Sequence, residues 1–210
     1  MLSRRGVLVA SAALMAASLA GCKIVQIADQ EAAAPAGFDA QAYAEDLWSD
    51  QVLPHFSASA RPVAEVIPAV HESLEAAGNA YGYRAAEGSP WAFIVSGTGQ
   101  VIAKNTESRA GTLDIKVEGL PDSVALQIGP VIRGNAIRDA LPFVSFQDFT
   151  NQLEYADAGK ALTALALQAI SPAAENIAVG DSVAFTGAVS LANAADRLQI
   201  TLVELDKTSP

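Results

Sequence analysis

Cysteine is almost absent from the sequence, because Cys22 is the only one among 210 residues. A single thiol cannot form an internal disulfide, and it cannot supply a zinc site that is built from several cysteines. Histidine is nearly as scarce: only His55 and His71 occur, and neither shows the acid–histidine spacing that metal sites use. We therefore expect no metal centre and no cofactor.

Basic residues are also few. The chain has 13 Lys and Arg against 23 Asp and Glu, which gives a formal net charge of −10. An acidic surface repels the phosphate backbone, so nucleic acid is not expected as a partner. After the N-terminal segment no stretch reaches 18 apolar residues, so we expect no second membrane span.

The N-terminus has the parts of an export signal. Residues 1–5 carry two arginines and no acid, residues 6–20 are apolar, and small residues precede Cys22. The apolar run is shorter than the roughly 20 residues that a membrane helix needs. We interpret residues 1–21 as a lipoprotein signal peptide and Cys22 as the lipidated first residue of the mature protein, anchored to a membrane. The alternative is an ordinary secretory signal with an incidental cysteine.

The export route and the membrane stay open at this stage. Residues 3–8 resemble the twin-arginine export motif, although Val7 stands where that motif commonly has phenylalanine. Arg4 and Arg5 are equally compatible with the positive charge that any signal carries. The predicted location is the cell envelope, facing the periplasm, on either the inner or the outer membrane.

A tether and a first helix are expected to follow. Residues 22–38 are rich in alanine and polar side chains without a sustained period, which is typical of a tether. Asp39 is a suitable N-cap for a helix that is expected to end at Pro54.

A second helix is indicated by apolar residues that repeat at three and four positions between residues 63 and 74. It is expected to begin at Pro62, to kink at Pro68 and to end just before Gly78. Together the two helices predict a small helical subdomain over residues 39–80.

The remaining pattern is mainly that of strands. The predicted strand regions are 91–103, interrupted by a turn at Ser96–Gly99, then 112–117, 124–128, 182–190 and 197–205. An alanine-rich helix over 149–170, with a candidate interruption at Gly159, separates the third region from the fourth. The sequence thus predicts an α+β protein: an N-terminal helical hairpin, then an OB-like five-stranded β-barrel over residues 81–206 with a helix between strands 3 and 4.

Six short segments carry a resemblance to a known family. They are Tyr81–Arg84, Pro90–Trp91, Ser108–Thr112, Gln127–Gly134, Ile137–Asp139 and Phe146–Gln152. These segments resemble the domain-of-unknown-function family 2291, predicted periplasmic lipoproteins, over about residues 40–205. The resemblance implies a helical part, a barrel-like part and no established activity. It also implies a link to sugar uptake, because genes of the family often lie beside those of carbohydrate ABC transporters.

Polar residues in and around these segments are the candidates for contact with a ligand or partner. They are Arg109, Arg133, Arg138, Asp139, Asn151 and Gln152. Guanidinium groups suit bidentate binding of carboxylate or phosphate, so three clustered arginines could bind an anion. The alternative, which the sequence favours, is that each arginine pairs with an acid such as Asp139, Asp148 or Glu154 and holds a strand to a helix.

No catalytic residue is predicted. Ser96–Gly99 lacks the G-x-S-x-G order of a nucleophile elbow and does not open a helix as a phosphate-binding loop does. The sequence therefore favours a non-catalytic envelope lipoprotein that is accessory to carbohydrate ABC transport, through contact with the solute or with transporter components. The alternative is an envelope enzyme acting on a carbohydrate or cell-wall component, which a pocket lined by carboxylates of perturbed pKa would support.

Overall fold

The computed structural model describes residues 37–208, so the predicted signal peptide, Cys22 and most of the tether lie outside the described residues. Residues 39–208 lie within one compact unit. No helix within residues 37–208 is long and apolar enough to cross a membrane. In chain order the elements are α3 (Ala40–Leu47), η2 (Trp48–Val52), α4 (Leu53–Ser59), β1 (Arg61–Pro62), α5 (Val63–Glu72), α6 (Leu74–Tyr81), β2 (Gly82–Tyr83), β3 (Trp91–Asn105), β4 (Thr112–Val117), β5 (Val124–Gln127), α7 (Ala136–Asp139), η3 (Phe146–Asp148), α8 (Gln152–Asn176), β6 (Ser182–Leu191) and β7 (Gln199–Thr208).

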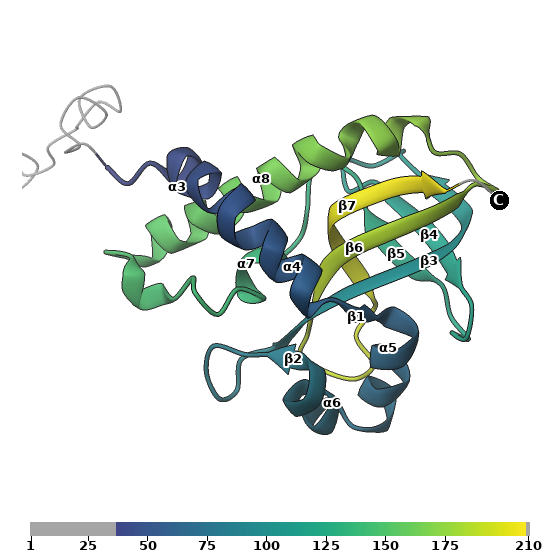
Figure 1. Cartoon of the computed structure of the whole chain (residues 1–210), viewed down its shortest axis with the longest axis horizontal. Helices are drawn as coiled ribbons and strands as arrows, with labels where there is room; N and C mark the ends of the chain where they lie inside the picture. The colour runs from purple at the N-terminus through teal and green to yellow at the C-terminus, as the bar shows by residue number, and fades with distance from the viewer. Residues whose placement is uncertain (1–36, 209–210) are drawn as a thin grey trace, which may run out of the picture. The chain divides into compact units, whose positions relative to one another are not determined.

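The sheet has five main strands whose pairing returns to its starting point. β3 pairs with β4, β4 with β5, β5 with β7, β7 with β6, and β6 again with β3 (Figure 1). Within this circuit only the β5–β7 pair is parallel. The short β1 and β2 add to β3. In chain order, three main strands are followed by helices and then by two further main strands. The predicted α+β class is confirmed.

The turn expected at Ser96–Gly99 is wrong, because these residues lie inside β3. These residues belong to one continuous strand that pairs with β6 from Trp91 to Gln100 and with β4 from Gly99 onward. The glycines serve close packing instead of a turn, because a Cβ on Gly97 would press against the rings and methyl groups of Phe185 and Val63. Local composition could not separate a glycine that turns the chain from one that admits a neighbour.

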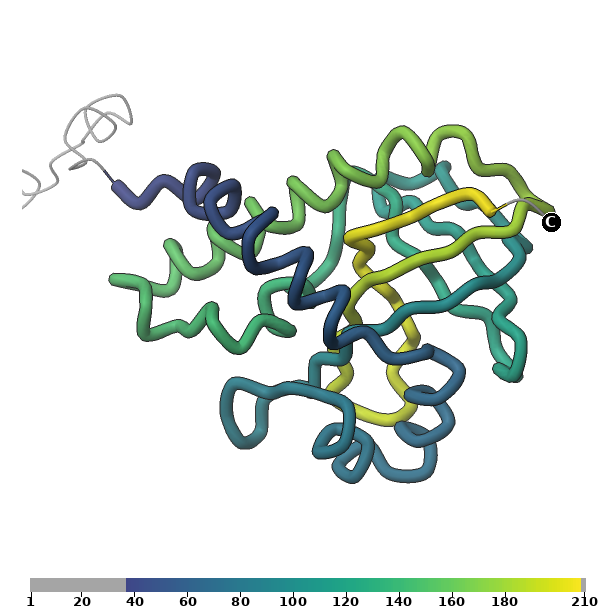
Figure 2. The backbone as a smooth tube through the Cα atoms, in the orientation of Figure 1, coloured from purple at the N-terminus to yellow at the C-terminus, as the bar shows by residue number. Residues whose placement is uncertain are grey.

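The first helix does not end at Pro54. Asp39 caps α3 as expected, since its carboxylate accepts hydrogen bonds from two backbone N–H groups of the first turn. The helix then widens into the π-helical turn η2 and continues through α4, and Figure 2 shows this backbone running on without a break. Pro54 lies in the first turn of α4, where a missing N–H is tolerated.

The second predicted helix is two helices. α5 passes through Pro68, and the chain breaks instead at Ser73, whose backbone is extended. The Ser73 hydroxyl accepts a hydrogen bond from the N–H of Ala76 at 3.2 Å, so Ser73 is the N-cap of α6. Gly78 lies inside α6 and packs against the Trp91 ring, with no space for a side chain.

α8 is longer and more regular than the sequence indicated. Gly159 does not interrupt it; the glycine allows Asn135 and Arg138 to approach, since a Cβ there would lie 2.6 Å from Asn135 Oδ1. Leu153, which matches the helical apolar period, is 76% exposed. It lies in the first turn of α8, beyond the part of the helix that packs on the sheet.

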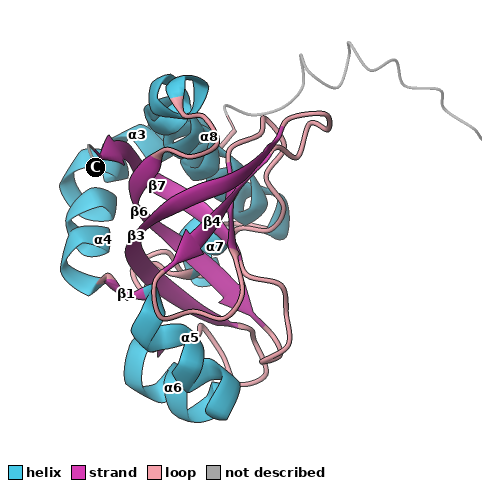
Figure 3. Cartoon of the chain, turned by 90° about the vertical axis from the view of Figure 1, so that its right-hand side faces the viewer, coloured by secondary structure: helices cyan, strands magenta, loops and turns pink. Residues whose placement is uncertain are grey.

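One apolar core joins the sheet to the helices at its ends. α5 contributes Val66 and Ile67 to this core, the C-terminal part of α8 contributes Ile170 and Ala174, and Phe93 of β3 is fully buried. Figures 1 and 3 show α5 and α6 at one end of the sheet and α8 at the opposite end. One end of the sheet is therefore covered by α5 and α6, which precede β3, and the other by α8, which lies between β5 and β6.

Candidate functional site

A cavity of about 300 Å³ lies between the segment after β2, the α7 region and the start of α8. We call it the aromatic cavity. Its walls are Tyr83, Ala85, Ser89, Pro90, Arg138, Asp139, Leu141, Val144, Phe146 and Tyr155. Five of these residues belong to four of the six segments that carry the family resemblance, namely Tyr83, Pro90, Arg138, Asp139 and Phe146. The fold thus brings together segments that are far apart in the sequence, since Tyr83 and Phe146 are separated by 63 positions.

Arg138 and Asp139 form the polar part of this cavity. Nε and one terminal nitrogen of Arg138 donate to Asp139 Oδ1 at 3.0 and 2.6 Å. The other terminal nitrogen donates to the backbone carbonyl of Tyr155 at 3.2 Å. A guanidinium carries five N–H donors, so two remain, and Asp139 Oδ2 accepts no hydrogen bond from the described residues. Donors and an acceptor therefore stand side by side at the cavity.

Aromatic rings form the other wall. The Arg138 guanidinium lies over the Tyr155 ring at 3.8 Å from its centroid, and the Phe146 ring meets Tyr155 edge-on at 5.6 Å. Burial raises the pKa of Tyr155, so its hydroxyl is neutral and can donate a hydrogen bond. Phe146 is 52% exposed and presents part of its ring to solvent. This combination of apolar faces and a few fixed polar groups is typical of a small-molecule site.

Arg109 and Arg133 are not part of the aromatic cavity. Both are exposed, and neither side chain makes a hydrogen bond or ion pair with the described residues. Their loops are neighbours, because the Val131 N–H donates to the Arg109 carbonyl at 3.1 Å. The Arg133 N–H donates to Gln127 Oε1 at 3.2 Å within its own part of the chain. Arg138 is bound to Asp139 instead, so the three arginines do not gather around one anion site.

The other candidates are at the start of α8. Asn151 is its N-cap and accepts hydrogen bonds from the N–H groups of Leu153 and Glu154 at 2.9 and 3.1 Å. Gln152 is the first residue of the helix and is exposed. The Glu154 carboxylate, considered as a partner for arginine, instead accepts from the N–H of Thr150 at 2.9 Å. Asn151 thus has a clear role in helix capping.

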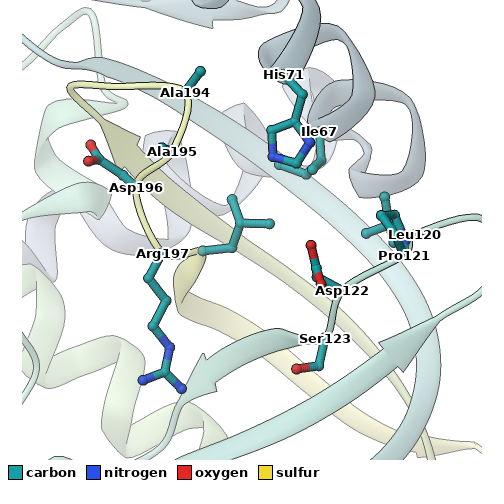
Figure 4. Close-up of a pocket in the computed structure, with 11 residues that line it drawn as sticks. Ile67, His71, Leu120, Pro121, Asp122, Ser123, Ala194, Ala195, Asp196 and Arg197 are labelled. Carbon is teal, nitrogen blue, oxygen red and sulfur yellow. The ribbon is translucent and has the colours of Figure 1, made fainter.

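A further cavity of about 310 Å³, the α5 cavity, lies between α5 and the loops 120–123 and 194–198. Figure 4 shows His71 and Asp122 pointing into it, while the Arg197 guanidinium extends away. Arg197 lies 3.7 Å from Asp114. The Asp196 carboxylate accepts from two backbone N–H groups at 2.8 Å and is occupied by its own loop. None of its lining residues belongs to the six segments that carry the family resemblance, so this is the weaker candidate.

Hydrogen bonds lower the pKa of two carboxylates, Asp181 and Asp196. The Lys207 ammonium, 2.8 Å from Asp181, is the main cause at that residue. At Asp196 the cause is the backbone N–H groups of Asn193 and Ala192. Of these two carboxylates only Asp196 lines a described cavity, the α5 cavity, and a lowered pKa does not suit it to act as a general acid. No three potential metal-ligating side chains gather among residues 37–208.

These two carboxylates predict acid sensitivity of the fold. Each has a folded-state pKa below its reference value of 3.8, so its stabilising contribution is complete above that pH and is lost as the pH falls through the folded value. The melting temperature should therefore fall in acid, and Asp181→Asn with Asp196→Asn should reduce the slope of that fall. Circular dichroism melts at successive pH values below about 4 would measure it. Asp122→Asn is the control, and an equal change in slope there would contradict the assignment.

Sequence reasoning found the polar pair of the aromatic cavity and missed its rings. Tyr83 and Phe146 lie within segments that carry the family resemblance, yet neither was singled out. Their residue type could have identified them, because each is an aromatic residue in a short segment rich in glycine or polar residues. Tyr155 gave no signal, because an aromatic residue in a helix most often belongs to the core.

Comparison with known proteins identifies both the fold and the family. A crystal structure of an OB-fold protein from Thermotoga maritima superposes with a TM-score of 0.67 and 17% identity, over 82% of this chain and 99% of that chain. At this identity the likeness shows the fold alone. No curated protein matches the chain. The family described as "Predicted periplasmic lipoprotein (DUF2291)" matches residues 12–206, which confirms the resemblance carried by the six segments. Because this match covers most of the sequence, the chain belongs to the DUF2291 family of predicted periplasmic lipoproteins.

Proposed function

We propose that this protein is a non-catalytic lipoprotein, anchored by lipid at Cys22, that binds a sugar in the aromatic cavity and serves carbohydrate ABC transport. The observation that carries the proposal is the pairing of free Arg138 donors and the free Asp139 Oδ2 beside partly exposed aromatic rings. Adjacent hydroxyls of a sugar both donate and accept, so they suit a donor–acceptor pair. The C–H face of a sugar ring suits the electron-rich face of an aromatic ring.

The Arg138–Asp139 pair also explains why the site suits a neutral ligand. The guanidinium and the carboxylate largely cancel each other's charge at 2.6 Å. An anion would have to compete with Asp139 for the guanidinium, whereas a hydroxyl pair can add to both groups without separating them. A cavity of about 300 Å³ is at the lower limit for small-molecule sites, which fits one sugar ring.

The fold and the anchor fit this role. We infer that the closed strand circuit is the five-stranded OB barrel predicted from the sequence, with the aromatic cavity built outside it by α7, α8 and the segment after β2. Lipid at Cys22 would hold this cavity at the membrane surface, where a transporter or its binding protein can exchange solute with it. Contact with transporter components is the second part of the proposal.

Titration calorimetry of the intact lipoprotein, in a detergent without a sugar headgroup, tests sugar binding. We expect at least one of glucose, galactose, ribose or xylose to bind. Phe146→Ser should weaken that binding about tenfold, because it removes an exposed ring of the cavity wall. Asp139→Asn should weaken it by a similar factor, because it removes the carboxylate acceptor.

Leu153→Ser is the matched control, since it also removes an exposed apolar side chain but lies outside the cavity. Its affinity should stay within about twofold of the original. The proposal would be refuted if none of the sugars binds, or if neither cavity substitution changes the affinity of the sugar that binds.

A further inference from the structure

A second cavity of about 290 Å³ adjoins the aromatic cavity. Tyr83 lines both. The segment 139–142 also lines both cavities. Asp139 and Leu141 line the aromatic cavity, and Ala140 and Pro142 line the second cavity. The two cavities therefore share the half-buried Tyr83 and lie on the two sides of the segment 139–142.

The second cavity has a different charge, and we call it the basic cavity. Arg61 of β1 lines it, is exposed, and makes no side-chain hydrogen bond or ion pair with the described residues. His55 also lines it, but its ring nitrogens face the Ala140 carbonyl at 3.2 Å and the Ser59 hydroxyl at 3.5 Å. No Asp or Glu among the described residues lines this cavity. Arg61 is thus a free cation in a chain of net charge −10.

Size and charge together indicate one extended site. Each cavity alone lies at the lower limit of ligand pockets, which span about 300–1,000 Å³, whereas the two together lie well within that range. The aromatic cavity carries a self-neutralised Arg138–Asp139 pair, and the basic cavity carries the unpaired Arg61. A free guanidinium binds carboxylate or phosphate more strongly than it binds a neutral hydroxyl.

We propose that the two cavities on either side of Tyr83 form one binding site for an acidic saccharide of at least two units. The neutral unit lies in the aromatic cavity, and the unit that carries a carboxylate or phosphate lies against Arg61. Tyr83 sits under the linkage between the units. This inference rests on the proposed sugar-binding function and names the class of sugar.

Matched series of sugars test the inference on the intact lipoprotein by titration calorimetry. One series is glucose, cellobiose and cellobionate, and the other is galactose, lactose and lactobionate. Within each series the non-reducing unit is constant. The disaccharide adds a second ring, and the aldobionate replaces that ring with an open-chain aldonate that carries a carboxylate. In at least one series we expect the aldobionate to bind about tenfold or more tightly than the neutral disaccharide. This gain should shrink as salt concentration rises.

Arg61→Gln is the deciding variant. It should abolish the gain from the carboxylate and leave monosaccharide affinity within about twofold. Arg109→Gln removes the same charge outside both cavities and should keep the gain. Thermal melts of each variant establish that the fold is intact.

The outcomes separate this inference from the function on which it rests. Monosaccharide binding with no gain for the aldobionate, or a gain that survives Arg61→Gln, would overturn the extended acidic site and leave sugar binding in place. Binding of no sugar in either series would overturn both. A gain that is lost equally in Arg109→Gln would assign it to the overall charge of the protein and would also overturn the role of Arg61.

Discussion

Gly129→Ala is expected to lower the free energy of unfolding by about 3 kcal/mol, at the upper end of what overpacking costs. A Cβ on Gly129 would overlap the backbone nitrogen of Gly111 and the backbone carbonyl of Arg109. Neither neighbour can rotate away, because both are main-chain atoms. The Gly129 N–H also donates to the Gly111 carbonyl at 3.0 Å, so moving the loops apart would lengthen this hydrogen bond.

Urea denaturation of the mature chain carrying Cys22→Ser, followed by tryptophan fluorescence, would measure the loss. Gly134→Asn is the matched control on the same connection. Gly134 has a positive φ of 81° with open space around it, and asparagine tolerates that conformation, so its cost should stay below about 1 kcal/mol. A similar cost for both substitutions would show that steric overlap at Gly129 is not the cause.

Strands could be predicted from the sequence where apolar residues alternate with polar ones. β4 matches its prediction residue for residue, because Leu113, Ile115 and Val117 are buried and alternate with more exposed residues. The same alternation located β6 and β7 to within a few residues. A period of two is a property of neighbouring residues, so it is visible without knowledge of the fold.

Interruptions of helices and strands could not be predicted in the same way. Pro54 and Pro68 are both accommodated within helical segments, whereas Ser73 ends one helix and caps the next. Gly97 and Gly159 are glycines because a distant element packs on them. Ser73 caps α6 through a local hydrogen bond, but the glycine contacts join segments far apart in the sequence, which no local pattern contains.

The aromatic cavity shows the same limit for the site. Arg138 and Asp139 are candidates from the sequence because they lie in a segment that carries the family resemblance, and basic residues are few. Tyr83, Phe146 and Tyr155 could not be assigned to the same place, because only the packing of α7 against α8 and of β2 against β3 brings them to one wall. A functional site built by tertiary contacts gives isolated signals in the sequence, and the structure is needed to join them.

Lys104→Met is expected to lower the free energy of unfolding by about 2–3 kcal/mol, because hydrogen bonds from a charged donor contribute more than neutral ones. Lys104 Nζ donates to the carbonyls of Ala174 and Ile177 at 2.8 Å and of Glu175 at 3.3 Å. These carbonyls end α8 and carry the negative end of its dipole. Methionine keeps most of the apolar stem and removes the ammonium, so the loss reports on the three hydrogen bonds.

The same substitution should loosen the C-terminal turn of α8 more than the rest of the fold. Amide hydrogen exchange should accelerate at residues 174–178 while the amides of β4 keep most of their protection, because local opening of this turn does not require the sheet to open. Lys116→Met is the matched control: Lys116 is exposed on β4 and makes no side-chain hydrogen bond with the described residues. Its cost should be below about 0.5 kcal/mol. Equal costs for the two lysines would mean that the helix end is satisfied by water and that β3 and α8 are joined by their apolar contacts alone.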